Sequence, residues 1–273
     1  CIIRFSLRHG LFVDKKKDGP ALKTGSLVDC LVLTPEDFND SFYIAGEEYT
    51  ASLNKLFEFL VDQEIMPKTD EELLDIVRNL KLWDKNKDET VLQKIPEKFG
   101  QEIAKGIYNK SKHAITEEEY QNANLIKFTL NTHPLTKSIF KGDKDFLPQV
   151  AGIADYKGLL YKFMVDLIQI DKVNKIVYVY DLKTGIKNFG SFISNFLQFR
   201  YDIQYFLYTR GVKQILPLLV EDSEEYEIKP LEFIYIYKKN NFVPAIYKVP
   251  KNLDIENGYT TKYGYQMTGV KEL

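Results

Sequence analysis

The chain has 273 residues, of which 44% are hydrophobic and 14% aromatic, so it can bury a sizeable core and belongs to the globular class. Its formal net charge of −2 argues against a protein that coats nucleic acid by overall positive charge, so any such contact must come from a local patch. The two cysteines, Cys1 and Cys30, lack CxxC spacing, which argues against a cysteine-based zinc or iron–sulfur site.

No hydrophobic run approaches the roughly 20 residues that a membrane-spanning helix needs, and no signal-peptide pattern opens the sequence. We therefore expect a cytoplasmic protein in a reducing compartment, with no membrane partner. The sequence begins at Cys1 rather than at methionine, as is expected of a processed or trimmed chain.

Residues 1–148 have mostly helical patterns. The segment 47–62 places leucine and phenylalanine at helical spacing on one face. A second helix has Thr69 as its N-cap and acidic residues in its first turn. A third begins at Thr116 and ends near His133, because a proline follows and restricts the conformation of the residue before it.

The pattern changes to that of strands near residue 148. The segment 149–185 predicts three consecutive strands that are joined by two short turns. The third strand, IVYVYDLKTG (176–185), ends with Asp181 and Lys183. Because strand side chains alternate between the two faces, these two residues point the same way.

A segment of helical periodicity, 192–212, follows and predicts one long helix, and 231–250 predicts two more strands. We therefore expect an α/β (α+β) fold with a central mixed sheet of about five strands, flanked by helices, and a mostly helical N-terminal half. No repeat or low-complexity linker interrupts the sequence. We expect a single domain made of a helical part (1–148), a sheet with its long helix (149–250) and a tail (251–273).

A second acid, Asp166, lies near the end of the strand before Asp181. Adjacent antiparallel strands can bring these two carboxylates side by side, where they repel unless a cation lies between them. Magnesium is the natural cation, because it prefers oxygen ligands and commonly takes one or two protein carboxylates. Lys183 could then orient or help to deprotonate a water, or neutralise charge on a phosphate. The alternative is a solvent-exposed strand edge, but Asp166 follows an apolar run and calls for a partner.

The predicted long helix carries a polar stripe. Its members fall at helical spacing and so share one face, namely Leu197, Arg200 or Tyr201, Gln204 and Tyr208. A stripe that contains arginine, glutamine and tyrosine is too polar for a simple core face.

At this point the sequence resembles the PD-(D/E)xK nuclease superfamily, in its RecB-type branch. Three motifs of that branch match in order and spacing, namely Asp166, then Asp181-Leu182-Lys183, then Gln204-x-x-x-Tyr208. Three further segments resemble parts of RecE-type phage exonucleases. They are a glycine-led apolar helix (23–45), a helix before the catalytic sheet (115–140) and a closing strand pair (231–250). The resemblance covers about residues 20–250, and it implies a restriction-endonuclease-like core.

One position departs from that resemblance. Such proteins usually carry histidine four residues after the glycine, where this chain has Asp29, four after Gly25. An aspartate is a harder oxygen ligand and suits magnesium; a solvent-facing acid on a helix turn is the alternative. If Asp29 is not a ligand, Glu36 and Glu47 are the next candidates.

The resemblance implies a metal-dependent phosphodiesterase, and it implies a role for each residue that matches its motifs. One or two Mg²⁺ ions, with Mn²⁺ as a substitute, are implied to be held by carboxylates and one backbone carbonyl, namely Asp29, Asp166, Asp181 and the carbonyl of Leu182. Lys183 is implied to position the attacking water. Gln204 and Tyr208 are implied to steady the site and the DNA backbone, and Arg200 to contact a phosphate.

The resemblance also implies a substrate and partners. Exonucleases of this kind degrade one strand of double-stranded DNA ends, typically 5′ to 3′, and leave single-stranded tails for an annealing protein in phage-type recombination. The implied setting is a bacterial or phage-infected cell, and a homo-oligomeric ring would supply the retention on DNA that the modest charge does not. Two alternatives stay open: an inactive nuclease-fold module that binds DNA ends, and an endonuclease or RNase of the same fold.

Other motifs have simpler interpretations. The histidines His9, His113 and His133 show no ligand spacing, and we interpret them as surface or capping residues. DKKKDGP (14–20) is typical of a solvated loop, although it could touch DNA. The tyrosine-rich YTTKYGYQ (259–266) could stack on nucleic-acid bases, although an exposed irregular terminus is the simpler interpretation.

Overall fold

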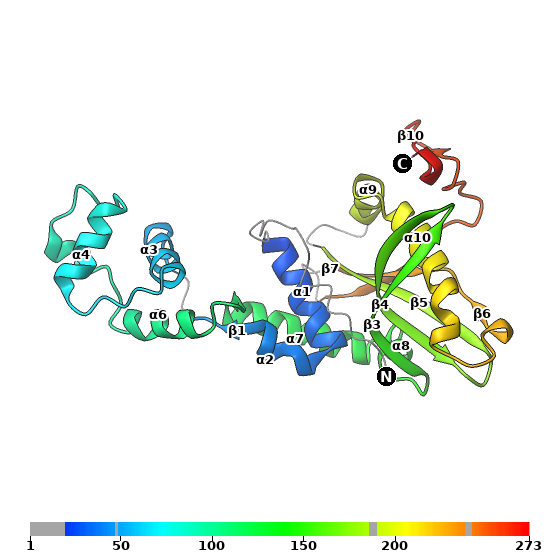
Figure 1. The fold of residues 1–273 in the computed structure, drawn as a ribbon, viewed down its shortest axis with the longest axis horizontal. Helices are drawn as coiled ribbons and strands as arrows, with labels where there is room; N and C mark the ends of the chain where they lie inside the picture. The colour runs from blue at the N-terminus through cyan, green and yellow to red at the C-terminus, as the bar shows by residue number, and fades with distance from the viewer. Residues whose placement is uncertain (1–19, 47–48, 186–189, 238–241, 273) are drawn as a thin grey trace. The chain divides into compact units, whose positions relative to one another are not determined.

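The computed structural model describes most of the chain (Figure 1), namely residues 20–46, 49–185, 190–237 and 242–272. Four of the interpretations above fall outside these ranges, those for Cys1, His9, residues 14–19 and Glu47. None of the described helices combines the length and the apolar character that crossing a membrane requires.

The chain divides into two compact units. One comprises Glu36–Ala123, and the other combines Cys1–Pro35 with Asn124–Leu273. That the whole chain acts as a single nuclease domain stays a prediction.

The unit Glu36–Ala123 is mostly helical, as predicted. Its elements are α2 (Phe38–Ser41), β1 (Phe42–Ile44), α3 (Ala51–Asp62), α4 (Asp70–Asn79), α5 (Asp88–Leu92), α6 (Phe99–Tyr108) and β2 (His113–Ile115), preceded by the short 3₁₀ turn Pro35–Asp37. The strands β1 and β2 pair in parallel. Helix α3 buries the apolar face that its spacing predicts, with Leu53, Leu56 and Leu60 in a core shared with α4 and α6.

Two predicted helix starts are confirmed by their caps. The Thr69 hydroxyl accepts a hydrogen bond from the Glu72 amide at 3.2 Å, at the start of α4. Before α7 (Glu117–Thr132), Thr116 and Glu119 form a reciprocal capping box, with each side chain accepting from the other's amide, at 2.9 and 3.0 Å. Helix α7 ends one residue before His133, as the following proline predicts.

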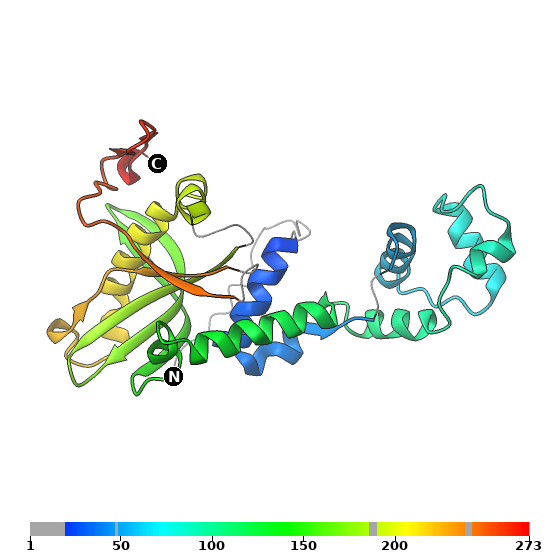
Figure 2. The ribbon, with the colours of Figure 1, turned by 180° about the vertical axis from the view of Figure 1, so that it is seen from behind.

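The second unit contains the sheet (Figures 1 and 2). Its elements are α1 (Pro20–Leu33), α8 (Lys137–Phe140), β3 (Asp145–Tyr156), β4 (Leu159–Asp171), β5 (Ile176–Gly185), α9 (Gly190–Gln198), α10 (Tyr201–Ile215), β6 (Glu227–Ile228), β7 (Glu232–Tyr237), β8 (Pro244–Lys248), β9 (Tyr259–Thr260), β10 (Gln266–Met267) and the 3₁₀ turns Leu216–Leu218, Ser223–Glu225 and Val270–Glu272. Part of α7 also belongs to this unit.

The strand order is β3-β4-β5-β7-β8, with the short β6 paired to β5. The neighbours β3–β4, β4–β5 and β7–β8 are antiparallel, and β5 runs parallel to β6 and β7. The parallel pair needs a crossover, which the helices α9 and α10 supply. The predicted fold class is confirmed: this is a mixed sheet flanked by helices.

Strand β5 is covered on both faces, which explains its near-continuous apolar run. Val177 and Val179 join the core cluster that α9 and α10 pack against. Tyr180 and Leu182 point to the other face and are also buried. Helix α10 contacts β3 and β4, and helix α1 contacts β4 and β5.

The prediction of one long helix over 192–212 was wrong, because the chain breaks into α9 and α10. Arg200 adopts the left-handed conformation between them, with φ 53° and ψ 46°. Phe192 of α9 stacks on Tyr247 of β8 at 4.1 Å between ring centroids, and α10 packs on β3 and β4. Leu197 therefore does not share a helix face with Gln204 and Tyr208.

Candidate active site

The candidate site lies where the pairing of β4 with its neighbours is interrupted. Toward β5, the paired residues end at Leu167 and Tyr180, so the next residues along the two strands are Asp166 and Asp181. Toward β3, Gln149 stands outside the ladder with a left-handed φ of 47°. The antiparallel register of β4 and β5 thus places Asp166 and Asp181 at one level of the sheet.

The interruption gives each carboxylate a partner from β5 or α10. The Leu182 amide donates to Oδ2 of Asp166 at 2.7 Å. The side-chain amide of Gln204 donates to Oδ1 of Asp181 at 2.5 Å, and Nζ of Lys183 lies 2.5 Å from Oδ2 of Asp181. Because Asp181 is only 1% exposed, these two partners compensate for the hydration that its carboxylate has lost.

Lys183 is enclosed from a second side. Its side chain is 22% exposed, and its ammonium lies 4.9 Å from the centroid of the Tyr201 ring, at the start of α10. A cation over an aromatic face is stabilised by the electrostatic field of the ring. The lysine is therefore held between the carboxylate of Asp181 and the ring of Tyr201.

Tyr208 extends the same set of contacts along α10. Burial raises the pKa of its hydroxyl, as do the charges of Asp181 and Asp166, while Lys183 and a hydrogen bond with Gln204 act the other way. The hydroxyl is therefore neutral near pH 7. Tyr208, Gln204 and Asp181 form a chain of contacts from α10 to β5.

The charges of the site oppose one another. Burial raises the pKa of Asp166 well above its ordinary value, and the charges of Asp181 and Asp29 raise it further. Burial also raises the pKa of Asp181, against the influence of Lys183 and Gln204. Burial alone would lower the pKa of Lys183, but the charges of Asp181 and Asp166 outweigh it and raise that pKa. The charges of these acids therefore exceed what Lys183 alone balances.

Asp29 lies on α1, which contacts β4 and β5, and its charge acts on Asp166. Within the described ranges, no three His, Cys, Asp or Glu side chains are grouped closely enough to hold a metal ion. The chemistry of the donor set nevertheless fits a divalent cation, because a dication stabilises crowded carboxylates in a buried setting. Asp166 and Asp181 are its central members.

Arg200 makes a different set of contacts from the rest of the stripe. Its Nε and Nη2 donate to the two carboxylate oxygens of Asp202, at 3.1 and 3.2 Å, and Nη2 also donates to the carbonyl of Thr268 at 2.5 Å. Asp202 is fully buried and accepts a further hydrogen bond from the Tyr259 hydroxyl at 3.1 Å. A phosphate contact by Arg200 stays a prediction. Because Nε and Nη2 already bind Asp202, such a contact would use the rest of the guanidinium group.

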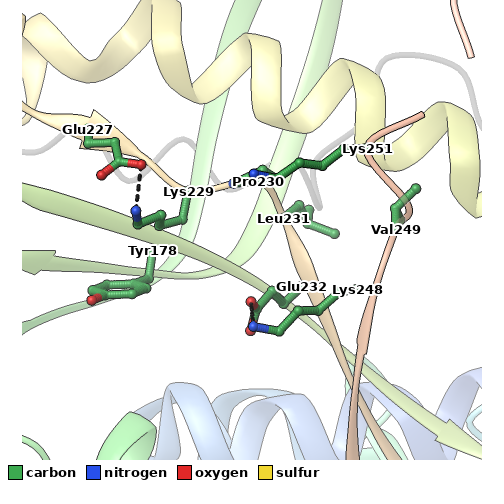
Figure 3. Close-up of a pocket in the computed structure, with 9 residues that line it drawn as sticks. All are labelled: Tyr178, Glu227, Lys229, Pro230, Leu231, Glu232, Lys248, Val249 and Lys251. Atoms are coloured by element: carbon green, nitrogen blue, oxygen red, sulfur yellow. Dashed lines mark hydrogen bonds and ion pairs between the residues drawn. The ribbon is translucent and has the colours of Figure 1, made fainter. Parts of the chain in front are cut away.

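A separate cavity of about 360 Å³ lies elsewhere on the sheet (Figure 3). Tyr178 lines it, and because Tyr178 and Asp181 are three residues apart on β5 their side chains point to opposite faces. The acids of the cavity are already paired: Glu227 with Lys229 at 2.5 Å, and Glu232 with Lys248 at 2.8 Å. The nine residues that line this cavity include none of the predicted site residues.

Sequence reasoning missed two features of this region. Tyr201 was only one of two candidates for a position in the polar stripe. The break in the helix was not predicted, and neither was the contact of the Tyr201 ring with Lys183. The contacts of Asp202 with Tyr259 join residues 57 positions apart, and no local pattern announces such a contact.

Comparisons with known proteins identify a family for this chain. The model of a family described as a PDDEXK-like domain of unknown function (DUF3799) matches residues 9–261. Among solved structures, a protein from Eubacterium rectale described as a candidate exonuclease aligns over 89% of this chain and 80% of its own, with 12% identity and a TM-score of 0.33. The comparison with curated proteins found no match.

Proposed function

The chain belongs to the PDDEXK-like family whose model it matches, and we propose that it is a metal-dependent nuclease that degrades one strand of double-stranded DNA ends. Membership of the family supports a nuclease and a divalent metal ion. One observation carries the proposal further: Asp166, Asp181 and Lys183 converge at an interruption of the sheet, with Gln204 bound to Asp181.

Asp166 and Asp181 would hold the ion, with Asp29 and the carbonyl of Leu182 as further ligands. Mg²⁺ is the ion that this oxygen donor set suits best, and Mn²⁺ is its natural substitute. When bound, the ion supplies positive charge to the oxygens of the scissile phosphate. The raised pKa of Asp166 supports this assignment, because a dication stabilises the ionised form of the crowded acids.

The residues of the chain have separate tasks in the proposed reaction. Lys183 has a positive charge at neutral pH, so its ammonium can hold the attacking water and the developing charge of the phosphate by hydrogen bonds. Gln204 fixes the orientation of the Asp181 carboxylate, and Tyr208 supports Gln204 from one turn further along α10. Arg200 is proposed as a contact of the DNA backbone, and so are Gln204 and Tyr208.

The finer parts of the proposal rest on the resemblance to RecE-type exonucleases. They are 5′ to 3′ polarity, single-stranded tails passed to an annealing protein in phage-type recombination, and a homo-oligomeric ring in a bacterial or phage-infected cell. A net charge of −2 supports the ring, because enclosure of the duplex would retain the enzyme where electrostatic attraction is weak.

The test compares linear duplexes labelled at either 5′ or 3′ ends with circular DNA and RNA, in Mg²⁺, in Mn²⁺ and in EDTA. We expect metal-dependent release of nucleotides from linear DNA alone, with the 5′ label lost first. Lys183→Ala should abolish turnover while the ion still binds. The control is Lys248→Ala, which removes a lysine paired with Glu232 on the same sheet and should leave the turnover unchanged. Binding of ends without cleavage in any ion would instead identify an inactive end-binding module, and cleavage of circles or RNA would identify an endonuclease or RNase.

A further inference from the structure

The C-terminal part of the second unit contains a small hairpin, residues 259–267, which we call the tyrosine hairpin. Strands β9 and β10 pair in antiparallel fashion, with Tyr259 opposite Met267. The turn between them is closed by hydrogen bonds to Thr261: its hydroxyl accepts from the Tyr265 amide at 3.1 Å, and its carbonyl from the Gly264 amide at 2.9 Å. Gly264 has φ +84°, which glycine adopts without strain. The hairpin tip is therefore a defined turn.

The tip presents two aromatic rings to solvent. Tyr263 is 65% exposed and Tyr265 is 64% exposed. The ammonium of Lys262 lies 5.0 Å from the centroid of the Tyr263 ring. The sequence of the hairpin, YTTKYGYQM, contains one lysine and no acidic residue, so the segment itself carries a positive charge on a chain that is negative overall.

The hairpin is fixed to the helix that supports the candidate site. At its beginning the Tyr259 hydroxyl donates to Asp202, and just past its end the Thr268 carbonyl accepts from Arg200. Both anchors thus lie at the start of α10. Gln204, which binds Asp181, follows Asp202 by two residues, a rise of about 3 Å along the helix axis.

These observations point to a ligand with flat aromatic groups and negative charge. Bases of single-stranded nucleic acid stack on exposed tyrosine rings, and their phosphates pair with a nearby lysine. In a duplex the bases are stacked on one another, so exposed rings favour an unpaired strand. We propose that the tyrosine hairpin is a single-strand binding site, in which bases stack on Tyr263 and Tyr265 and Lys262 pairs with a phosphate. The strand it would bind is the one that the proposed nuclease exposes, so this inference rests on the proposed function for its biological setting.

The test measures binding without cleavage, using the full chain in EDTA and a fluorescein-labelled dT oligonucleotide, by anisotropy. Tyr263→Ala with Tyr265→Ala should raise the Kd by about tenfold or more, because both rings on which bases would stack are removed. Tyr263→Phe with Tyr265→Phe keeps both rings and should stay within about twofold of the unaltered chain. Tyr108→Ala removes an 84% exposed tyrosine of the other unit and should leave the Kd unchanged.

Two results would overturn the proposal. One is an alanine pair that binds the oligonucleotide as tightly as the unaltered chain, which would assign the exposed rings to a protein partner or to no ligand. The other is an equal loss in the phenylalanine pair, which would show that stacking is not the interaction. Neither result depends on nuclease activity. Conversely, absence of cleavage in both Mg²⁺ and Mn²⁺ would refute the proposed function and leave the binding result standing.

Discussion

The side-chain amide of Gln204 donates a hydrogen bond to the buried carboxylate of Asp181, across 2.5 Å. The contact joins β5 to α10, a helix of the crossover that follows β5 in the chain. Lys183 binds the other oxygen of the same carboxylate. Both oxygens of Asp181 are thus oriented by the protein, which leaves the orientation of this acid dependent on two side chains.

The first prediction concerns the role of Gln204 in orienting the Asp181 carboxylate. Gln204→Ala should lower the nuclease rate by about 10- to 100-fold, the usual cost of losing a residue that orients a metal-binding carboxylate. The ion concentration that gives half-maximal rate should rise as well. Gln214→Ala is the matched control: Gln214 lies on the same helix and makes two hydrogen bonds with the backbone of Asp155, away from the site. Full activity at unchanged ion dependence in Gln204→Ala would show that Asp181 needs no such support.

The second prediction concerns the ring beside the lysine. Tyr201→Leu removes the aromatic face that lies 4.9 Å from Nζ of Lys183, and a cation–π contact is worth roughly 0.5–2 kcal/mol. We expect the single-turnover cleavage rate to fall by about tenfold, with little change in KM, because the ring positions the lysine rather than the substrate.

Tyr201→Phe keeps the face of the ring and should retain most of the rate. Tyr205→Leu removes a half-buried ring one turn further along α10 and controls for general loss of packing. If Tyr201→Leu and Tyr205→Leu lowered the rate equally, the ring would serve the core alone.

Much of this arrangement follows from local sequence. Strand alternation places Asp181 and Lys183 on one face of the sheet, and helical spacing places Gln204 one turn before Tyr208. The sequence could therefore predict that the two members of each pair lie close together. The order of the strands could not be predicted, and neither could the break at Arg200. That break is stabilised by Asp202, Tyr259 and Thr268, and the contacts span up to 68 positions. Long-range contacts of this kind leave no periodic signal in the sequence.

The third prediction concerns pH and stability without divalent ions. Because the pKa of Asp166 is higher in the folded chain than its ordinary 3.8, the folded state binds more protons than the unfolded state. The contribution of Asp166 to the free energy of unfolding is therefore most favourable below about pH 4 and falls as the pH rises through its folded pKa. At pH 7 in EDTA, Asp166→Asn should raise the Tm. The side-chain oxygen of the introduced amide can still accept the hydrogen bond from the Leu182 amide.

The control for that experiment is Asp171, the last residue of β4. Hydrogen bonds from Asn174 lower the pKa of Asp171, so Asp171→Asn should lower the Tm at pH 7, and this difference should vanish as the pH falls below about 4. Mg²⁺ should raise the Tm of the unaltered chain and raise that of Asp166→Asn less. A Tm for Asp166→Asn below that of the unaltered chain in EDTA would contradict the repulsion that the site is inferred to contain.

The last prediction concerns Asp29, where the chain departs from the RecE-type pattern. Its charge acts on Asp166 from α1, so removing it should weaken the ion site. Asp29→Ala should reduce the cleavage rate by orders of magnitude and weaken Mg²⁺ binding in calorimetric titration. Asp29→His should recover part of the rate, and more of it in Mn²⁺ than in Mg²⁺, because imidazole suits the softer ion. Asp143→Ala, which removes an exposed acid of the same unit, should change neither quantity. An Asp29→Ala enzyme with full activity and unchanged ion affinity would place the third ligand elsewhere, and Glu36 and Glu47 would then be substituted in turn.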